Sequence, residues 1–460
     1  MAGTVSKLID KIVKHRSKGN EEVAMATLEK IALQLGRPLE TFTPQSLDDE
    51  ETIEKVITIG TNLGLDLRSY AASLRGDSNR VKTTPATESL WGFTDEVSPI
   101  AAAAKLREIV HGGSGGLLIY FASSSYQAEA LAWAIKKEFW QSKVIGCTTA
   151  GELSPAGLTK NSLVGLYLPP SYLHGVEVAV VTELSKGAAG AGKAVNYLAD
   201  RFGKKPLELD PKEFVGIVLP DGLSGGEEEL MVALGGVTDA PFIGGSAGDD
   251  LKFKKTSVFC EDKAYSNAAV LALIHLKVPY KITKTQSFSM RDETLTATEV
   301  NLKNRSVLSF NNKPAATAYA DALNVGENEL DNSLLTSHPL GLSVGKSPYV
   351  RSPQQVLDNQ EIKFYCRVEQ GSELRVLNNT DIVGDTKKAI DETEFNLGRP
   401  VGAMVVFNCI LRHLELESRG LTRDFVASFG ARHFIGFSTY GEQYIGHINQ
   451  TATVLCLAKP

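Results

Sequence analysis

Val144-Ile-Gly-Cys-Thr-Thr-Ala-Gly-Glu152 is the stretch that decides the fold prediction, because it returns twice along the chain. It recurs as Ile435-Gly-Phe-Ser-Thr-Tyr-Gly-Glu442 and, one residue shorter, as Ile243-Gly-Gly-Ser-Ala-Gly-Asp249. Glycine allows close backbone approach, and the hydroxyl and carboxylate groups supply directional hydrogen bonds. A structural turn repeated by duplication is the simpler interpretation of any single copy. Three copies that end on an acid favour a shared ligand site.

Each copy lies in the same order of predicted elements. A buried-strand run at residues 117–122 and a helical pattern at 126–140 precede the first copy, and a further strand at 163–168 follows it. Similar runs flank the other two copies. Strands joined through a helix are normally parallel, whereas a strand that follows closely is an antiparallel neighbour. The sequence therefore predicts an α/β fold of duplicated strand-helix-strand units with mixed sheets, and the acidic turns at strand ends, where α/β folds usually place ligands.

The N-terminal residues have a different pattern. Residues 1–82 carry amphipathic helical spacing and predict a small all-α module, and residues 75–88 read as a linker rich in Ser, Thr, Asn, Gly and Pro. From residue 280 to about 399 the pattern changes to hairpin-like strands and turns. We therefore predict three parts, at residues 1–82, 83–278 and 279–460.

Composition limits the classes of function. The 460 residues are 43% hydrophobic and 22% charged, which is typical of soluble globular proteins. The net charge of −6 is too mild to indicate nucleic-acid or anionic-membrane binding. No apolar stretch is long enough for a membrane span or resembles a signal peptide, so a cytoplasmic location is expected. Five widely spaced cysteines indicate neither a disulfide framework nor a metal site.

The chain resembles the two-part FIST sensory domain of bacterial signal transduction proteins. Residues 117–276 are similar to its N-terminal part through the first two copies of the repeat, and residues 280–458 are similar to its C-terminal part. The C-terminal motifs are Asn312-Lys-Pro-Ala315, Tyr319, His338-Pro-Leu-Gly341, Val350-Arg-Ser-Pro353, Cys409-Ile-Leu-Arg412, Gly436 to Glu442 and Asn449-Gln-Thr451. The resemblance implies an intracellular domain that binds a small polar ligand, such as an amino acid, and passes the signal on; some members resemble haem-based gas sensors.

The repeat and the resemblance together predict a set of ligand contacts. Cys147 is expected as a contact rather than a reactive thiol, because the other copies have Gly245 and Phe437 in its place. Arg412 is a candidate counter-ion for the acids, because Arg binds a carboxylate through two hydrogen bonds. The predicted contacts are Cys147, Thr148, Thr149, Glu152, Ser246, Asp249, Asp250, Arg412, Thr439, Tyr440, Glu442 and Asn449.

Two alternatives stay open beside a binding protein. The sequence lacks the metalloprotease, nucleophile-elbow, kinase and dinucleotide signatures, so we predict that the protein is not an enzyme. Glu152, Asp249 and Glu442 could nevertheless converge as acid and base in a hydrolase or lyase. Alternatively, His447 or His433 could be an axial ligand of haem. The cofactor is left open, and the expected partners are a small-molecule ligand, a signalling protein, which could bind the N-terminal helices, and a second copy of the chain in a homo-oligomer.

Overall fold

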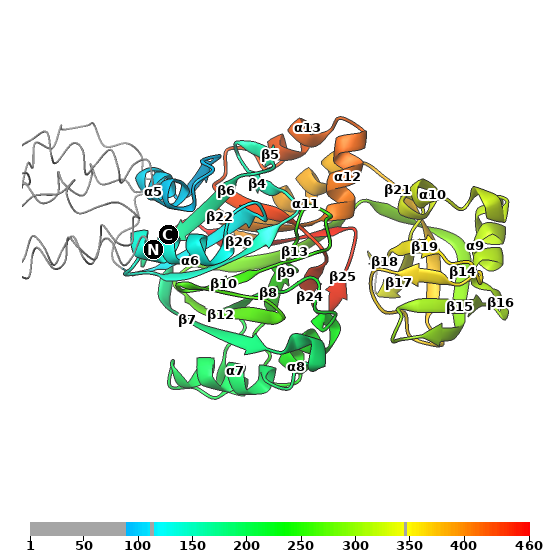
Figure 1. Ribbon diagram of the computed structural model, residues 1–460, viewed down its shortest axis with the longest axis horizontal. Coiled ribbons are helices and arrows are strands. Elements are labelled where there is room, and N and C mark those ends of the chain that lie inside the picture. Colours follow the sequence, from blue (N-terminus) through cyan, green and yellow to red (C-terminus); the bar gives the residue numbers. More distant parts are fainter. Residues whose placement is uncertain (1–88, 111–114, 345–346) are drawn as a thin grey trace, which may run out of the picture. The chain divides into compact units, whose positions relative to one another are not determined.

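The computed structural model describes residues 89–110, 115–344 and 347–460, and these residues belong to one compact unit (Figure 1). This part of the chain is a mixed α/β structure with several mixed sheets, which confirms the predicted fold class. The helical module predicted for residues 1–82 lies outside the described residues. Within the described ranges, no helix is both long enough and apolar enough to cross a membrane.

Three units with the same order of elements make up the main body. Each has an edge strand, a first inner strand, a helix, a second inner strand, a hairpin and a third inner strand, and a helix precedes the first inner strand. The first unit contains β1 (Trp91–Thr94), α5 (Pro99–Ile109), β2 (Leu117–Ser123), α6 (Ala128–Glu138), β3 (Lys143–Thr149), β4 (Glu152–Ser154), β5 (Gly157–Thr159) and β6 (Leu163–Leu168). The second contains β7 (Leu173–Thr182), α7 (Ala191–Asp200), β8 (Phe214–Pro220), α8 (Glu227–Gly235), β9 (Phe242–Gly245), β10 (Val258–Cys260), β11 (Lys263–Tyr265) and β12 (Ala268–Leu276). The third contains β13 (Tyr280–Gln286), α11 (Ile382–Leu397), β22 (Val401–Cys409), α12 (Ile410–Ser418), α13 (Thr422–Ala427), β23 (Phe434–Thr439), β24 (Glu442–Tyr444), β25 (His447–Ile448) and β26 (Thr451–Ala458).

The three sheets exchange hairpins in a cycle. In every unit the first two inner strands are parallel and the third pairs antiparallel with the first. The hairpin that follows the second inner strand leaves its own unit. The β4–β5 hairpin of unit one joins β23 of unit three, β24–β25 of unit three joins β9 of unit two, and β10–β11 of unit two joins β3 of unit one. Strands therefore pair across the boundary predicted at residues 278–279, and the division into domains stays a prediction.

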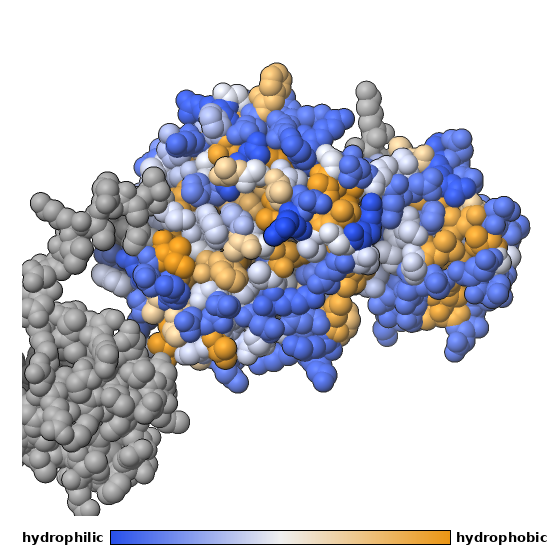
Figure 2. Space-filling view, turned by 90° about the horizontal axis from the view of Figure 1, so that it is seen from above, coloured by the Kyte–Doolittle hydropathy of each residue, from blue (hydrophilic) through white to orange (hydrophobic). Residues whose placement is uncertain are grey.

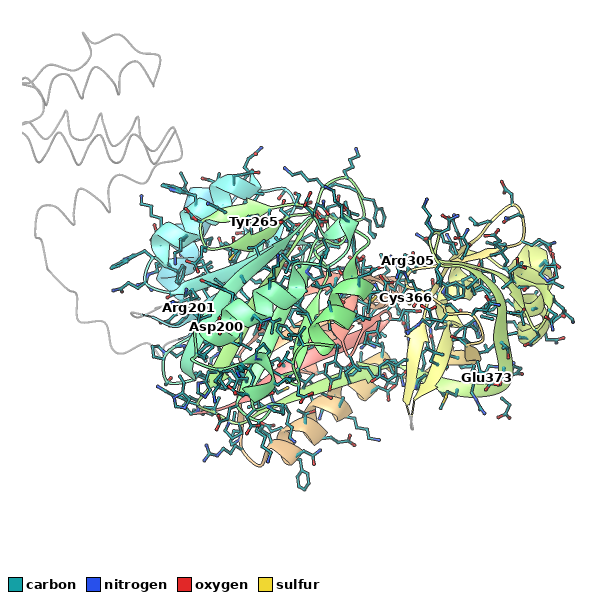
Figure 3. The ribbon with its side chains drawn as sticks, turned by 90° about the horizontal axis from the view of Figure 1, so that it is seen from below. Asp200, Arg201, Tyr265, Arg305, Cys366 and Glu373 are labelled. Carbon is teal, nitrogen blue, oxygen red and sulfur yellow. The ribbon has the colours of Figure 1, made fainter. Side chains whose placement is uncertain are left out.

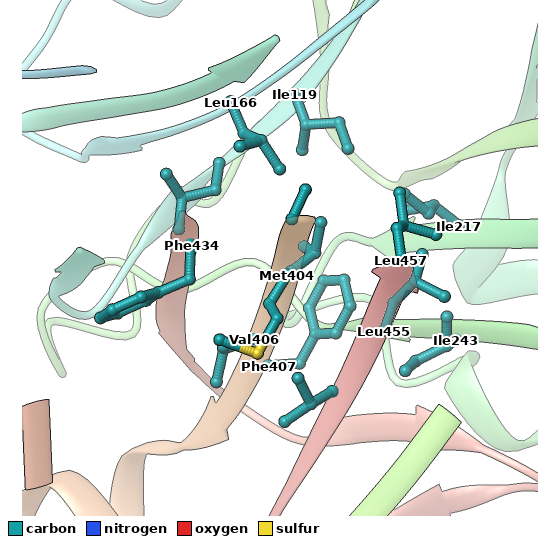
Figure 4. Close-up of a cluster of buried hydrophobic side chains, with 14 of the residues drawn as sticks. Ile119, Leu166, Ile217, Ile243, Met404, Val406, Phe407, Phe434, Leu455 and Leu457 are labelled. Carbon is teal, nitrogen blue, oxygen red and sulfur yellow. The ribbon is translucent and has the colours of Figure 1, made fainter. Parts of the chain in front are cut away.

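One hydrophobic core lies between the three sheets. Side chains alternate between the two faces of a strand, and the inner faces of all three units meet in one cluster. Figure 4 shows Ile119, Ile217 and Phe407, one from each unit, in this core. The ring of Phe121 lies 4.5 Å from that of Phe437, centroid to centroid, which joins units one and three. The outer faces of the first two sheets are covered by α5 with α6 and by α7 with α8. The shared core fixes the carboxyl ends of the inner strands relative to one another.

An additional sheet is inserted in unit three between β13 and α11. Its strands are ordered β18-β17-β21-β14-β15-β20-β19, with β16 beside β15. The bounds are β14 (Phe288–Asn301), β15 (Ser306–Phe310), β16 (Lys313–Pro314), α9 (Ala315–Leu323), α10 (Asn332–Ser337), β17 (Leu340–Val344), β18 (Ser347–Arg351), β19 (Pro353–Val356), β20 (Ile362–Phe364) and β21 (Glu373–Asn379). Helix α9 packs on this sheet in a separate hydrophobic cluster. The insert thus has its own core.

Candidate ligand site where three strand ends meet

The three acidic turns contact one another directly. Each turn follows the second inner strand of its unit, and the exchanged hairpins bring the three strand ends together. The backbone hydrogen bonds that join the turns pairwise are Ser438 N to Gly151 O (2.8 Å), Gly248 N to Thr148 O (2.9 Å) and Ser246 N to Gly441 O (2.9 Å). Gly248 is required by this close approach, because a Cβ there would lie 2.8 Å from the backbone nitrogen of Ala150. We call this region the three-turn junction.

Glu152 is a buried residue whose carboxyl group holds the first turn in place through hydrogen bonds. We call such a carboxyl group, with the groups bonded to it, a clamp. Its Oε1 accepts a hydrogen bond from the hydroxyl of Thr149, and its Oε2 accepts from the backbone nitrogen (3.2 Å) and hydroxyl (2.6 Å) of Ser162. The side chain is fully buried. Burial raises the pKa of Glu152 to about 7, although the hydrogen bonds from Ser162 and Thr149 favour the carboxylate. The carboxyl group ties the turn to the start of β6.

Glu442 makes the same contacts in the third unit. Thr439 donates to Oε1 (2.7 Å), and Thr451 donates to Oε2 from its backbone nitrogen (3.1 Å) and its hydroxyl (2.6 Å). Burial again raises the pKa of this carboxyl to about 7, against hydrogen bonds from Thr451 and Thr439. The carboxyl oxygen atoms of Glu152 and Glu442 therefore all accept hydrogen bonds from other groups of the protein.

The second unit uses a different acid for this role. Asp221, at the end of β8, accepts hydrogen bonds from the hydroxyl of Thr256 and from the backbone nitrogen of Asn267 (2.5 Å), the residue that precedes β12. The shorter second copy has Ala247 where the other copies have the threonine hydroxyl, so its turn lacks the donor of the Glu152 clamp. Sequence reasoning missed Asp221, which was visible only as a polar residue at a strand end.

Asp249 instead holds the loop that follows it. Its carboxylate accepts from the backbone nitrogens of Phe253 (2.9 Å), Lys254 (2.6 Å) and Lys255 (2.9 Å), and from the hydroxyl of Tyr440 (2.5 Å). Burial opposes ionisation, but these hydrogen bonds outweigh it and lower the pKa of Asp249. The ring of Tyr440 also stacks on that of Phe253. Both predicted residues thus order an exposed loop.

Arg412 is buried without an ion pair to either clamp. Its guanidinium donates to Asn408 Oδ1 (3.1 Å), Ser287 Oγ (3.0 Å) and Thr386 Oγ1 (2.8 Å). Burial lowers the pKa of Arg412, and the charges of Glu415 and Glu442 act in the opposite direction. Arg412 therefore lies near the clamp of the third unit and joins three elements of it through neutral partners.

Three of the residues predicted to contact the ligand pack against or hydrogen-bond to other residues of the protein. Cys147 lies in the central core, where burial raises the pKa of its thiol. The hydroxyl of Thr148 donates to Ser257 O (3.3 Å) and accepts from Ser257 N (3.0 Å). The hydroxyl of Ser246 accepts from the amide nitrogen of Gln443 at 3.0 Å.

Several buried oxygen atoms near the junction have no hydrogen-bond partner among the described residues. Two belong to predicted contacts, Asp250 Oδ1 and Asn449 Oδ1. Two more, Gln443 Oε1 and Thr453 Oγ1, belong to residues that the sequence did not single out. Gln443 follows the acid of the third motif and Thr453 lies two residues beyond Thr451, so position in the repeat was the one available signal. Gln443, Asn449 and Thr453 are 0%, 1% and 0% exposed.

The histidines named for the haem alternative have contrasting surroundings. His447 is buried, its Nδ1 lies 2.9 Å from the amide nitrogen of Gln443, and burial lowers its pKa to about 4. His433 is partly exposed. Within residues 89–110, 115–344 and 347–460 no cluster of three or more His, Cys, Asp or Glu residues could hold a metal ion. Haem binding stays an untested alternative.

A surface cavity of about 480 Å³ lies beside β3 and β7, away from the junction. Its lining includes Lys143 and Glu261, which are paired with Glu177 and Lys136 respectively. Since these charges already have partners, we place the candidate ligand site at the three-turn junction instead.

Comparison with known proteins agrees with this architecture. The FIST N domain profile matches residues 116–313, and the FIST C domain profile matches residues 315–445. An uncharacterized protein of Methanocaldococcus jannaschii is 24% identical over 296 residues, which cover 60% of this chain and 56% of that protein. The chain thus spans little more than half the length of this relative. Together the two profiles cover most of the described residues, and the chain belongs to the FIST family of sensory domains.

Proposed function

We propose that this protein is a sensor that binds a small polar metabolite, such as an amino acid, at the three-turn junction. The observation that carries the proposal is the group of buried, unpartnered oxygen atoms of Gln443, Asn449 and Thr453. We call these three residues the open-acceptor group.

Buried polar atoms in proteins normally have hydrogen-bond partners. At this junction the rule holds for the carboxylates of Glu152 and Glu442, which are fully surrounded by donors. The open-acceptor group lies within one short segment of the third unit, from β24 to β26. Leaving one such atom unpaired costs about 1–3 kcal/mol. A ligand that donates hydrogen bonds to these oxygens would regain part of that free energy on binding.

The same geometry favours binding over turnover. A general base must reach the proton that it removes, yet both oxygens of Glu152 and Glu442 already accept hydrogen bonds from the chain. The hydroxyls of Thr149 and Thr439 donate to these acids, and that of Thr148 donates to the backbone of Ser257. The hydroxyls of Ser246 and Ser438 are bonded to the side chains of Gln443 and His413. We therefore infer that a bound metabolite dissociates from the protein without chemical conversion, whereas a hydrolase or lyase would release a product.

Two threonines of β26 provide a matched test. The hydroxyl of Thr451 is bonded to Glu442, whereas the hydroxyl of Thr453 is unpartnered. Thr451→Val should lower the free energy of unfolding by about 1–3 kcal/mol, because it removes a donor from a buried carboxyl. Thr453→Val should raise the free energy of unfolding, because it removes a buried unpartnered hydroxyl, but it should weaken ligand binding roughly threefold to tenfold.

The measurement is equilibrium dialysis of the full chain against a panel of amino acids and other polar metabolites, with mass spectrometry of both compartments. Urea unfolding of the wild type and both variants measures the change in the free energy of unfolding. The proposal fails if nothing in the panel binds, if Thr453→Val binds as tightly as the wild type, or if the recovered metabolite has been converted.

We further infer that the signal passes to a protein partner, through residues 1–82 or through another surface, and that a second copy of the chain is a candidate partner. The face seen in Figure 2 is mainly hydrophilic, with apolar residues in separate patches. Size-exclusion chromatography with and without the bound metabolite tests whether association changes with ligand.

A further inference from the structure

Two cations beside the junction have no carboxylate partner among the residues that the structure describes. The Nζ of Lys284, on β13, donates to the carbonyl of Pro348 (3.1 Å) and lies 3.6 Å from the centre of the Tyr349 ring. The Nη1 of Arg351, at the end of β18, donates to the carbonyl of Val350 (3.1 Å), while its Nε is buried and unpartnered. Within the described part of the chain, neither side chain forms an ion pair.

The two cations are close enough to affect each other. Burial lowers the pKa of Lys284 to about 8, and the charge of Arg351 acts in the same direction. Both side chains are only partly exposed, so solvent screens their repulsion less than at an open surface. Two like charges in a partly buried place are unfavourable unless an opposite charge compensates them.

Carboxylates elsewhere in this region do compensate a cation. Arg305 of the insert, which Figure 3 shows close to Cys366, is paired with Glu228 at 2.6 Å and with Glu227 at 3.4 Å of α8. Among the described residues, Arg305 therefore has carboxylate partners in ion pairs, whereas Lys284 and Arg351 have none. The difference points to a counter-ion from outside the described part of the chain.

The unpaired cations border the open-acceptor group. Lys284 and Thr453 are directly opposite each other in the β13–β26 pairing, so their side chains lie on the same face. Arg351 lies near His447, whose pKa its charge lowers in addition to the larger effect of burial, and His447 contacts Gln443. Positive charge and unpartnered oxygens are thus neighbours.

We propose that Lys284 and Arg351 bind the anionic group of the ligand, a carboxylate or a phosphate. This inference rests on the proposed sensor function and specifies its ligand class. Arg can hold two oxygens of such a group at once, and Lys adds a compact charge. The uncharged rest of the ligand would then donate hydrogen bonds to Thr453 and the other open acceptors.

The test uses the full chain with sodium acetate and with inorganic phosphate as probes, against sodium chloride at equal ionic strength. The variants are Lys284→Met and Arg351→Met, and the control is Lys281→Met, an exposed lysine of the same strand. In the wild type and in Lys281→Met, one probe should raise Tm above the chloride value. The probe that does so identifies a carboxylate or a phosphate.

In Lys284→Met and Arg351→Met, binding of that probe should weaken roughly tenfold or more. In chloride alone, Lys284→Met should melt at the same temperature as the wild type or higher, because an uncompensated cation is gone. A lower Tm in chloride would show that Lys284 serves only the Pro348 carbonyl, and an undiminished probe effect in both variants would place the anion elsewhere. Either result overturns the inference.

The metabolite panel separates the two proposals. If the wild type binds only metabolites that carry neither a carboxylate nor a phosphate, and neither probe raises Tm, the anion inference fails while the sensor stands. If nothing in the panel binds, the sensor itself fails.

Discussion

Glu442 is a residue whose protonation couples the fold to pH. Its carboxyl is fully buried and accepts three hydrogen bonds, and burial raises its pKa from 4.5 to about 7. Well below pH 4.5 the group is protonated in the folded and unfolded chains alike, and its contribution to stability is fully present. As the pH rises toward 7, the unfolded chain releases the proton before the folded chain does. Stability therefore falls across this window, on the order of 3 kcal/mol for this group.

Glu442→Gln should remove that contribution. Gln keeps the size of the side chain, and the hydroxyl of Thr439 can accept from its amide nitrogen. The free energy of unfolding of the variant, relative to the wild type, should rise by about 3 kcal/mol between pH 4.5 and pH 7. Urea unfolding at several pH values measures it, and Glu373→Gln, at an exposed glutamate, is the control. Parallel pH profiles for wild type and Glu442→Gln would contradict the assignment.

At the residue scale, the repeat predicted part of the junction. It identified Glu152 and Glu442, which have equivalent surroundings in the structure, because their copies share the hydroxyl donors. It could not identify Asp221, since the shorter second copy carries its acid at Asp249 and the replacement comes from another strand. Lys284 and Thr453 were beyond sequence reasoning, because an unpartnered atom is recognised only from its three-dimensional neighbours.

The loop after the second turn is an element held by one side chain. Asp250, Leu251 and Phe253 have φ values of 56°, 61° and 50°, which non-glycine residues adopt rarely. The Asp249 carboxylate bonds to three backbone nitrogens of this loop and thereby compensates for the strain. Order in the loop thus depends on Asp249 and on Tyr440.

Asp249→Ala should loosen this loop without unfolding the protein. The amides of Phe253, Lys254 and Lys255 should exchange with deuterium roughly tenfold to a hundredfold faster at neutral pH, since hydrogen bonds to a charged group contribute about 1.5–3 kcal/mol. Hydrogen exchange with mass spectrometry measures the change, and Asp262→Ala, in the exposed β10–β11 turn, is the control. Unchanged protection of residues 250–255 would mean that stacking of Phe253 on Tyr440 holds the loop.

The order of elements within a unit could be predicted, but the exchange of hairpins could not. Apolar runs at residues 117–122 and 163–168 correctly indicated buried strands, because a strand that is covered on both faces is apolar at almost every position. The short β4, β10 and β24 carry no signal that names their partners. The pattern of apolar residues predicts that a strand is buried. Which strand lies next to it is determined only by the packing of the three sheets.

At the scale of the molecule, the exchange makes the three units mutually dependent. The part of the chain before residue 279 contains β4 and β9, whose partners β23 and β24 lie in the part after it. Each half alone would leave inner strands without neighbours and would expose part of the shared core.

Separating the chain between residues 278 and 279 tests this dependence. Residues 85–278 and 279–460 expressed alone should bind a hydrophobic dye and unfold without a cooperative transition. When co-expressed, they should elute together and regain a single transition. Cooperative unfolding of either half by itself would show that the exchanged hairpins are dispensable for folding.

The exchange also determines the order of events on the ribosome. The β4–β5 hairpin leaves the exit tunnel long before β23 is synthesised, so the nascent chain holds unpaired strands through most of translation. Contacts between segments so distant in sequence form slowly, and open strand edges invite aggregation. We therefore expect this protein to complete its fold only after β26, the final inner strand of unit three, has left the tunnel, and to need chaperone protection until then.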